Sequence, residues 1–259
     1  MNTPAQHLLL ESHLKALRLP AFLENYRKFA SDAAGASHSY DRFLLALTEQ
    51  ELAIREKNRI ARLLRGARFP VMKELADFDF SAITSPGKQE VLELAQCAYI
   101  EAKEAILMVG NPGLGKSHIA TALATAACRH GAKVRFYNAA GLVGALTQAQ
   151  DEHRLPKFLA AAIKLDLVVL DELGFIPFTT AGSQLIFQFC SALYERVAII
   201  VTTNLRFADW TQVFGDERLT AALLDRLTHK AHILEFIGES YRFREHLKRA
   251  AKNPGDERE

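Results

Sequence analysis

Cysteine is scarce in this chain, and its few cysteines lack the spacing of a metal site. The 259 residues include only Cys97, Cys128 and Cys190, which form no CxxC pair and no other ligand spacing. This pattern excludes a metal centre built on paired cysteines. It is typical of a protein from a reducing intracellular compartment.

Long apolar runs are also missing. No stretch approaches the ~18 consecutive apolar residues that a membrane helix needs. The run Leu8-Leu9-Leu10 is too short for the apolar core of a signal peptide, and no basic region precedes it. We therefore expect a cytoplasmic protein that makes no use of a membrane.

A large excess of either charge is absent as well. Lysine and arginine number 32 against 30 aspartates and glutamates, for a formal net charge of +2. The overall charge therefore indicates no class of partner. With 49% hydrophobic and 24% charged residues, the composition is that of a soluble globular protein able to bury a substantial core.

The spacing of apolar residues and the local composition change along the chain. Residues 1–76 carry apolar side chains at helical spacing, interrupted at Pro20, with a second helix expected over Tyr40–Arg65. We interpret them as a small all-helical N-terminal domain that binds DNA or a partner. Residues 77–90, rich in Ser, Thr, Pro and Gly, are interpreted as a linker. A main domain over 91–252 and a disordered tail over 253–259 complete the predicted organisation.

Short apolar runs alternate with helical segments throughout the main domain. The runs expected to be strands are 105–109, 133–137, 167–170, 197–201 and 231–236. Strands that alternate with helices predict an α/β fold with a parallel five-stranded sheet flanked by helices.

A phosphate-binding loop is the strongest motif in the sequence. Between the first predicted strand and the helix expected from His118 lie Gly110, Asn111, Pro112, Gly113, Leu114, Gly115, Lys116 and Ser117. They match G-x-x-x-x-G-K-[ST], the P-loop or Walker A motif, whose glycines let backbone N–H groups face a phosphate. Lys116 is expected to reach the β- and γ-phosphates of ATP, and Ser117 to ligate Mg²⁺. We expect this loop and the adjacent His118 to bind the nucleotide.

An acidic pair follows the third predicted strand. Asp171 and Glu172 end the apolar run Leu167–Leu170, as in a Walker B element. Asp171 is expected to hold Mg²⁺ through water, and Glu172 to polarise the attacking water. A carboxylate beside the magnesium-holding aspartate favours ATP hydrolysis.

Two further signals lie downstream. Asn204 follows the strand that ends in Val201-Thr202-Thr203, where its amide would orient the lytic water. Arg226, in Leu224-Asp225-Arg226-Leu227, is the first candidate for an arginine that reaches the γ-phosphate of a neighbouring subunit. Arg218 in the same helical stretch is the second candidate, and ordinary surface charges on a helix are an alternative for both.

Together these motifs resemble the AAA+ ATPases of the DnaA/DnaC group. The stretches Gly110–Ser117, Val168–Gly174, Val201–Asn204, Asp225–Leu227 and Gly238–Arg242 resemble, more closely, IstB-like proteins, the ATP-binding helpers of insertion sequences. The resemblance spans nearly the whole chain. It implies a P-loop AAA+ fold, ATP and Mg²⁺ as cofactors, and a homo-oligomer that binds double-stranded DNA and recruits a cognate transposase. It also implies that Arg242, or the pair Arg242 and Arg244, contacts the nucleotide.

A basic stripe marks the second predicted helix. Its members are Arg55, Lys57, Arg59, Arg62 and Arg65. Positions spaced three or four apart share one helix face, which suits contact with DNA phosphates. The alternative is a solvated face that pairs with nearby glutamates.

Two rival functions follow from the same motifs. A replicative helicase loader similar to DnaC would use the N-terminal helices to hold a helicase. A small-molecule P-loop kinase would have no nucleic-acid partner, and Glu172 and Asn204 argue against it.

Overall fold

The computed structural model describes residues 4–240, and the chain divides into two compact units. The division lies between Arg62 and Leu63, inside the long helix α3 (Tyr40–Ala67). No helix among residues 4–240 is both long and apolar enough to cross a membrane.

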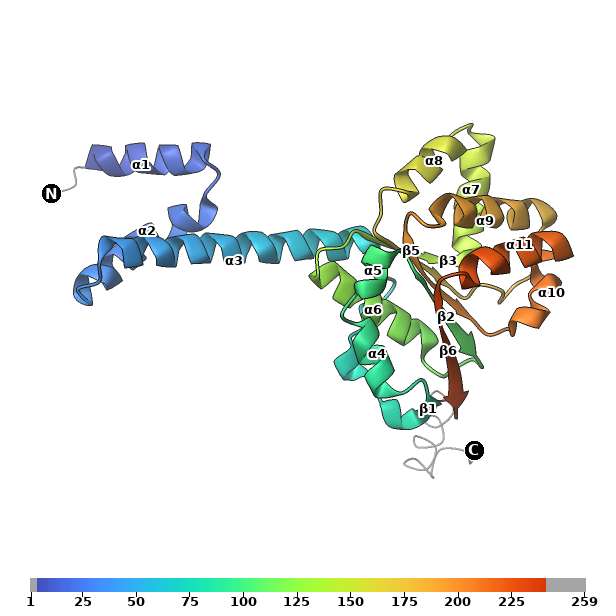
Figure 1. The fold of residues 1–259 in the computed structure, drawn as a ribbon. Helices are drawn as coiled ribbons and strands as arrows, with labels where there is room; N and C mark the ends of the chain where they lie inside the picture. The colour runs from blue at the N-terminus through green and yellow to red at the C-terminus, as the bar shows by residue number, and fades with distance from the viewer. Residues whose placement is uncertain (1–3, 241–259) are drawn as a thin grey trace, which may run out of the picture. The chain divides into compact units, whose positions relative to one another are not determined.

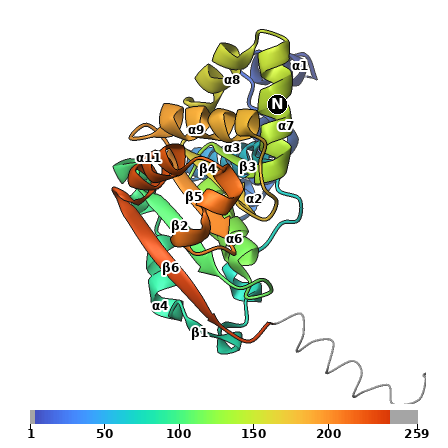
Figure 2. The same cartoon turned by 90° about the vertical axis from the view of Figure 1, so that its right-hand side faces the viewer.

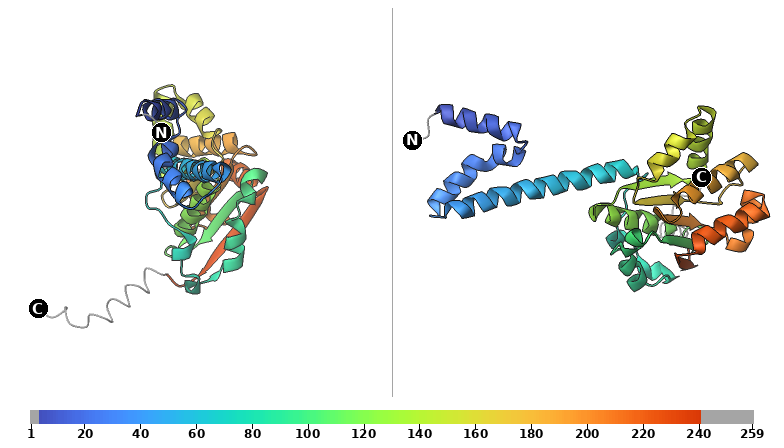
Figure 3. Two further views of the ribbon diagram at one scale, coloured as in Figure 1. Left: turned by 90° about the vertical axis from the view of Figure 1, so that its left-hand side faces the viewer. Right: turned by 45° about the horizontal axis from the view of Figure 1, so that its top comes forward.

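The N-terminal unit is a small helical assembly (Figure 3). It consists of α1 (Pro4–Ala16), α2 (Pro20–Gly35) and the first part of α3. Its buried core is small, consisting of Leu14, Tyr26 and Leu47. Pro20, expected as a helix breaker, also begins α2, because its fixed φ and missing N–H suit a first helical turn.

The second unit is a six-stranded sheet with helices on both faces (Figures 1 and 2). Its strands are β1 (Ile83–Ser85), β2 (Ala105–Gly110), β3 (Val134–Asn138), β4 (Leu167–Asp171), β5 (Ala198–Thr203) and β6 (Ala231–Gly238). Its helices are α4 (Lys88–Leu94), α5 (Ala98–Ala102), α6 (Lys116–Arg129), α7 (Ala139–Asp151), α8 (Leu155–Ala162), α9 (Thr180–Leu193), α10 (Thr211–Phe214) and α11 (Glu217–Thr228). Three short 3₁₀ turns are η1 (Leu75–Asp77), η2 (Phe80–Ala82) and η3 (Phe207–Asp209).

The predicted α/β class is confirmed, with a correction to the sheet. All five expected strands form, and they pair in parallel. The sixth strand, β1, pairs antiparallel with the end of β6, so the sheet is mixed. A three-residue strand is too short to show any period, and this one lies in the segment 77–90 that was interpreted as a linker.

Strand alternation builds two apolar layers. Ile106 and Met108 of β2 point into the layer beneath α4, α5 and α6. Leu107 of the same strand points into the opposite layer, where α7, α9 and α11 pack. All three side chains are almost fully buried, as parallel strands covered on both faces require.

The strand order places one loop at the centre of the sheet edge. Along the sheet the order is β1-β6-β2-β5-β4-β3, so β2 lies between strands that come last in the chain. The connection after β2 leads to the far edge at β3, whereas β6 returns to the other side of β2. The crevice at such a reversal, outside the carboxyl ends of parallel strands, is where open α/β sheets bind ligands.

Candidate nucleotide-binding site

The loop from β2 to α6 has the backbone that its glycines predict. Gly113 and Gly115 both have φ of +85°, a conformation that other residues adopt at a cost. A Cβ at Gly115 would collide with the ring of Phe78, and one at Gly113 would collide with the side chain of Ser240. The glycines therefore serve both the turn and the close approach of neighbouring segments. Helix α6 starts at Lys116 and presents its N-terminus to this loop.

Lys116 lies inside the loop and is held by carbonyl groups. Its Nζ donates to the carbonyl oxygens of Gly110, at 2.6 Å, and Asn111, at 2.9 Å. Burial lowers the pKa of Lys116 to about 8, although the carboxylates of Asp171 and Glu172 act in the opposite direction. A desolvated cation held by neutral oxygens is well suited to bind an entering phosphate, which would raise its pKa again.

This pKa predicts that nucleotide affinity depends on pH. Below pH 8 the free protein already carries the Lys116 charge, whereas above pH 8 binding must first take up a proton. We expect the affinity for ATP to fall by up to about tenfold per pH unit above pH 8. Titration with a fluorescent ATP analogue between pH 7 and pH 9.5 measures this slope.

The matched control for that titration is Lys116→Arg. An arginine stays charged over the whole range, so whatever affinity this variant keeps should not change with pH. A flat profile for the wild-type protein would contradict the lowered pKa of Lys116.

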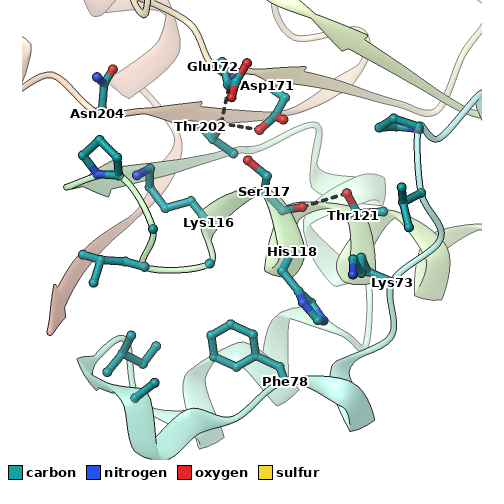
Figure 4. Close-up of a pocket in the computed structure, with 18 of the residues that line it drawn as sticks. Lys73, Phe78, Lys116, Ser117, His118, Thr121, Asp171, Glu172, Thr202 and Asn204 are labelled. Carbon is teal, nitrogen blue, oxygen red and sulfur yellow. Dashed lines mark hydrogen bonds between the residues drawn. The ribbon is translucent and has the colours of Figure 1, made fainter. Parts of the chain in front are cut away.

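Asp171 and Glu172 face the loop from the end of β4 (Figure 4). Asp171 is buried, while Glu172 is exposed and has a φ of +59°. The Oε2 of Glu172 accepts a 2.7 Å hydrogen bond from Nδ2 of Asn138, which ends β3. The Oδ1 of Asn138 also accepts from the N–H of Ala140 and so caps α7. Asn138 thus joins the Glu172 carboxylate to the start of a helix.

Asn204 lines the same cavity, beyond the end of β5 (Figure 4). Its Oδ1 is buried and has no hydrogen-bond partner among the described residues. Leaving a buried acceptor unpaired costs about 1–3 kcal/mol. Rotation of the side chain would relieve this cost by bringing the oxygen to a hydrogen-bond donor in the cavity.

The cavity holds about 820 Å³ and has a second wall that the sequence did not reveal. This wall is the segment 70–83, including Lys73, Asp77, Phe78 and Asp79. The segment has no periodic pattern of apolar residues, so nothing in the local sequence indicates that it lines the cavity.

The second wall is attached to the first turns of α6. The rings of Phe78 and His118 meet edge to face with centroids 5.2 Å apart. The His118 Nε2 lies 3.0 Å from the carbonyl oxygen of Glu74, whose carboxylate pairs with Arg129. One aromatic and apolar flank thus stands beside the phosphate-binding loop.

The arginine candidates lie elsewhere. Arg226 of α11 donates to the carbonyl oxygen of Ala222 at 2.7 Å, and its guanidinium stacks 4.9 Å from the ring centre of Phe187. Arg218 is exposed in the first turn of the same helix. Arg242 and Arg244 lie outside the described residues.

Comparison with known proteins agrees with this geometry. The model of the family "IstB-like ATP binding protein" matches residues 12–249. An ATP-binding protein of insertion sequence IS5376 from Geobacillus stearothermophilus is 34% identical, over 91% of this chain and 94% of its own. One of insertion sequence IS21 from Pseudomonas aeruginosa is 35% identical, over 92% of this chain and 90% of its own.

A solved structure supports the fold alone. The AMPPCP-bound DnaA from Aquifex aeolicus superposes with a TM-score of 0.52 at 19% identity, covering 72% of this chain and 57% of that one. The P-loop motif and the match to a family of ATP-binding proteins identify the chain as a P-loop ATPase. Since the family match extends over most of its length, the chain belongs to the family of IstB-like ATP-binding proteins.

Proposed function

We propose that this protein is a transposition helper that assembles as a homo-oligomer on double-stranded DNA, hydrolyses ATP and recruits a cognate transposase. One observation carries the proposal. The P-loop lysine, Asp171 at the end of β4 and Glu172 just after it line a single cavity large enough for a nucleotide. The naming of the relatives as ATP-binding proteins of insertion sequences supports the choice of transposition.

The residues present fit a nucleotide with Mg²⁺. Ser117 begins α6 beside Lys116, and its side chain lies on the same side of the cavity as Asp171 (Figure 4). A hydroxyl and a carboxylate are oxygen donors of the kind that Mg²⁺ prefers. Ser117 and Asp171 would hold Mg²⁺, which would supply positive charge to neutralise the phosphates. The aromatic flank of Phe78 and His118 offers an apolar surface for the base.

Three side chains would then have separate roles in hydrolysis. Lys116 leaves its loop carbonyls for the phosphate oxygens. Glu172 turns from Asn138 toward the attacking water and polarises it. Asn204 lines the same cavity and would turn its amide toward that water to orient it. An arginine of a neighbouring subunit, Arg226 or Arg218, would stabilise the charge of the transition state.

Helix α3 supplies the candidate DNA-binding surface. Its members Arg55, Lys57, Arg59, Arg62 and Arg65 are all exposed. Arg55 has fewer N–H groups available for DNA phosphates, because its guanidinium already donates to the buried Glu51 and to the carbonyl of Arg18. Arg59 pairs with Glu56 at 2.8 Å, but this pair is half exposed and therefore weak enough to exchange for phosphates.

Reversing two of these charges tests the surface. We expect Arg59→Glu with Arg62→Glu to weaken binding to duplex DNA and to flatten its salt dependence by about two units of log K per log salt. Fluorescence anisotropy at several salt concentrations measures both. The pair Arg59→Lys and Arg62→Lys is the control and should retain the wild-type slope. An unchanged slope in the reversed variant would place the DNA elsewhere.

A helicase loader is the second candidate, because the same nucleotide-binding motifs predict it, and a replication initiator shares the fold. Because that likeness shows the fold alone, the identity of the protein that this chain binds distinguishes a transposition helper from a helicase loader. A pull-down with the transposase and the replicative helicase of the same cell distinguishes the two. An ATPase assay with and without duplex DNA tests both against a small-molecule kinase, whose turnover would not respond to DNA.

A further inference from the structure

A threonine of β5 contacts three successive residues at the end of β4. Thr202 is 1% exposed, and its hydroxyl donates to Oδ1 of Asp171 at 2.6 Å. The hydroxyl oxygen of Thr202 in turn accepts a 2.9 Å hydrogen bond from the backbone N–H of Glu172. The Thr202 carbonyl accepts from the N–H of Leu173, also at 2.9 Å. Figure 4 shows the threonine beneath both acids.

These bonds lie where regular pairing between the two strands ends. The parallel pairing of β4 and β5 runs from Leu167 with Ala198 to Leu170 with Val201. Beyond it the chain turns away, because Glu172 adopts a left-handed conformation. The backbone N–H of Glu172 no longer pairs with the neighbouring strand, so the hydroxyl of Thr202 accepts its hydrogen bond instead. This bond offsets part of the cost of the left-handed conformation.

The direction of each bond is determined by its partners. The Glu172 N–H can only donate, so the single proton of the hydroxyl goes to Asp171. One carboxylate oxygen of Asp171 is thus used within the protein. The other would be available to water on a bound cation, and the carboxylate cannot rotate without breaking the 2.6 Å bond.

We propose that Thr202 is a positioning residue for ATP hydrolysis, whose hydroxyl orients Asp171 toward Mg²⁺ and fixes the backbone from which Glu172 reaches the attacking water. This inference rests on the proposed roles of those two acids. It assigns no contact with the nucleotide to Thr202 itself. Its action is through the two carboxylates.

Thr202→Val is the direct test, because valine keeps the shape and the β-branch but has no hydroxyl. We expect the maximal rate of ATP hydrolysis to fall by about 10- to 100-fold, as with other groups that orient metal-holding residues. The Mg²⁺ concentration for half-maximal rate should rise by about tenfold. Nucleotide binding in EDTA, which depends on Lys116, should stay within about threefold of wild type.

Two variants serve as controls. Thr202→Ser retains the hydroxyl and should restore both the rate and the Mg²⁺ dependence to within about threefold. Thr125→Val makes the same change at a buried threonine of α6 whose hydroxyl has no partner among the described residues, so it should alter neither. Should Thr202→Val not fold, Thr202→Cys offers a side chain of similar size with weak hydrogen bonding.

The outcomes separate the levels of the proposal. A wild-type protein without ATPase activity, alone or with duplex DNA, would overturn the proposed function itself. An active wild type together with a Thr202→Val variant of normal rate and Mg²⁺ dependence would overturn only the role of Thr202. Loss of nucleotide binding in EDTA, or failure of Thr202→Ser to rescue, would show a merely structural role and would also overturn it.

Discussion

Glu172→Gln is expected to slow ATP hydrolysis by about 10²- to 10⁴-fold while ATP still binds with nearly wild-type affinity. The amide has the size of the carboxylate but cannot accept the proton of the attacking water. In the proposed site other groups hold the phosphates, chiefly the loop and Lys116, so binding should persist. Single-turnover hydrolysis and equilibrium binding, measured on the same sample, separate the two effects.

The variant should also accumulate in its ATP-bound form on DNA. If assembly needs bound ATP and release needs hydrolysis, the Glu172→Gln oligomer will dissociate from duplex DNA more slowly than wild type. Glu195→Gln is the matched control, because Glu195 also has a left-handed backbone, with a φ of +58°, but is not among the residues that line the cavity. Normal turnover in Glu172→Gln would remove this residue from the mechanism.

Lys116→Ala is expected to reduce nucleotide affinity by about 100-fold or more, since it removes charged hydrogen bonds to two phosphates, each of which contributes about 1.5–3 kcal/mol. In the free protein the amine donates to the carbonyls of Gly110 and Asn111, so its removal also deprives the loop of these two hydrogen bonds. Isothermal titration with ATP and with ADP measures the loss.

Two controls keep that result interpretable. Lys157→Ala removes an exposed lysine of α8 and should bind nucleotide normally. Thermal unfolding should show that Lys116→Ala remains folded, because the change removes a buried charge that itself opposes folding. Tight binding of ATP by the folded Lys116→Ala protein would refute the assignment of the P-loop lysine.

Local sequence was sufficient for much of the fold. The expected strands form within one residue of their predicted starts, because continuous apolar runs mark strands buried on both faces. The family resemblance was confirmed by the match over residues 12–249. The roles of single residues, such as Arg226 as an arginine finger, stay predictions.

Other features could not be read from local sequence. Strand β1 is too short to show a period, and it exists only because the end of β6 pairs with it. The wall formed by residues 70–83 is a loop without pattern, and its position beside His118 depends on contacts distant in the chain. Asn138 ends a strand in the way many polar residues do, so nothing local marked its bond to Glu172.

By itself, the sequence determined the chemistry of the phosphate site, because a P-loop is one continuous segment whose glycines, lysine and serine act at fixed spacing along the chain. Only the tertiary structure decided how that loop meets its partners. Thr202 and Asn138 come from different strands, and parallel pairing in the order β5-β4-β3 brings them to the two acids. Hydrogen bonds between strands depend on register and strand order, which no local pattern of residues encodes.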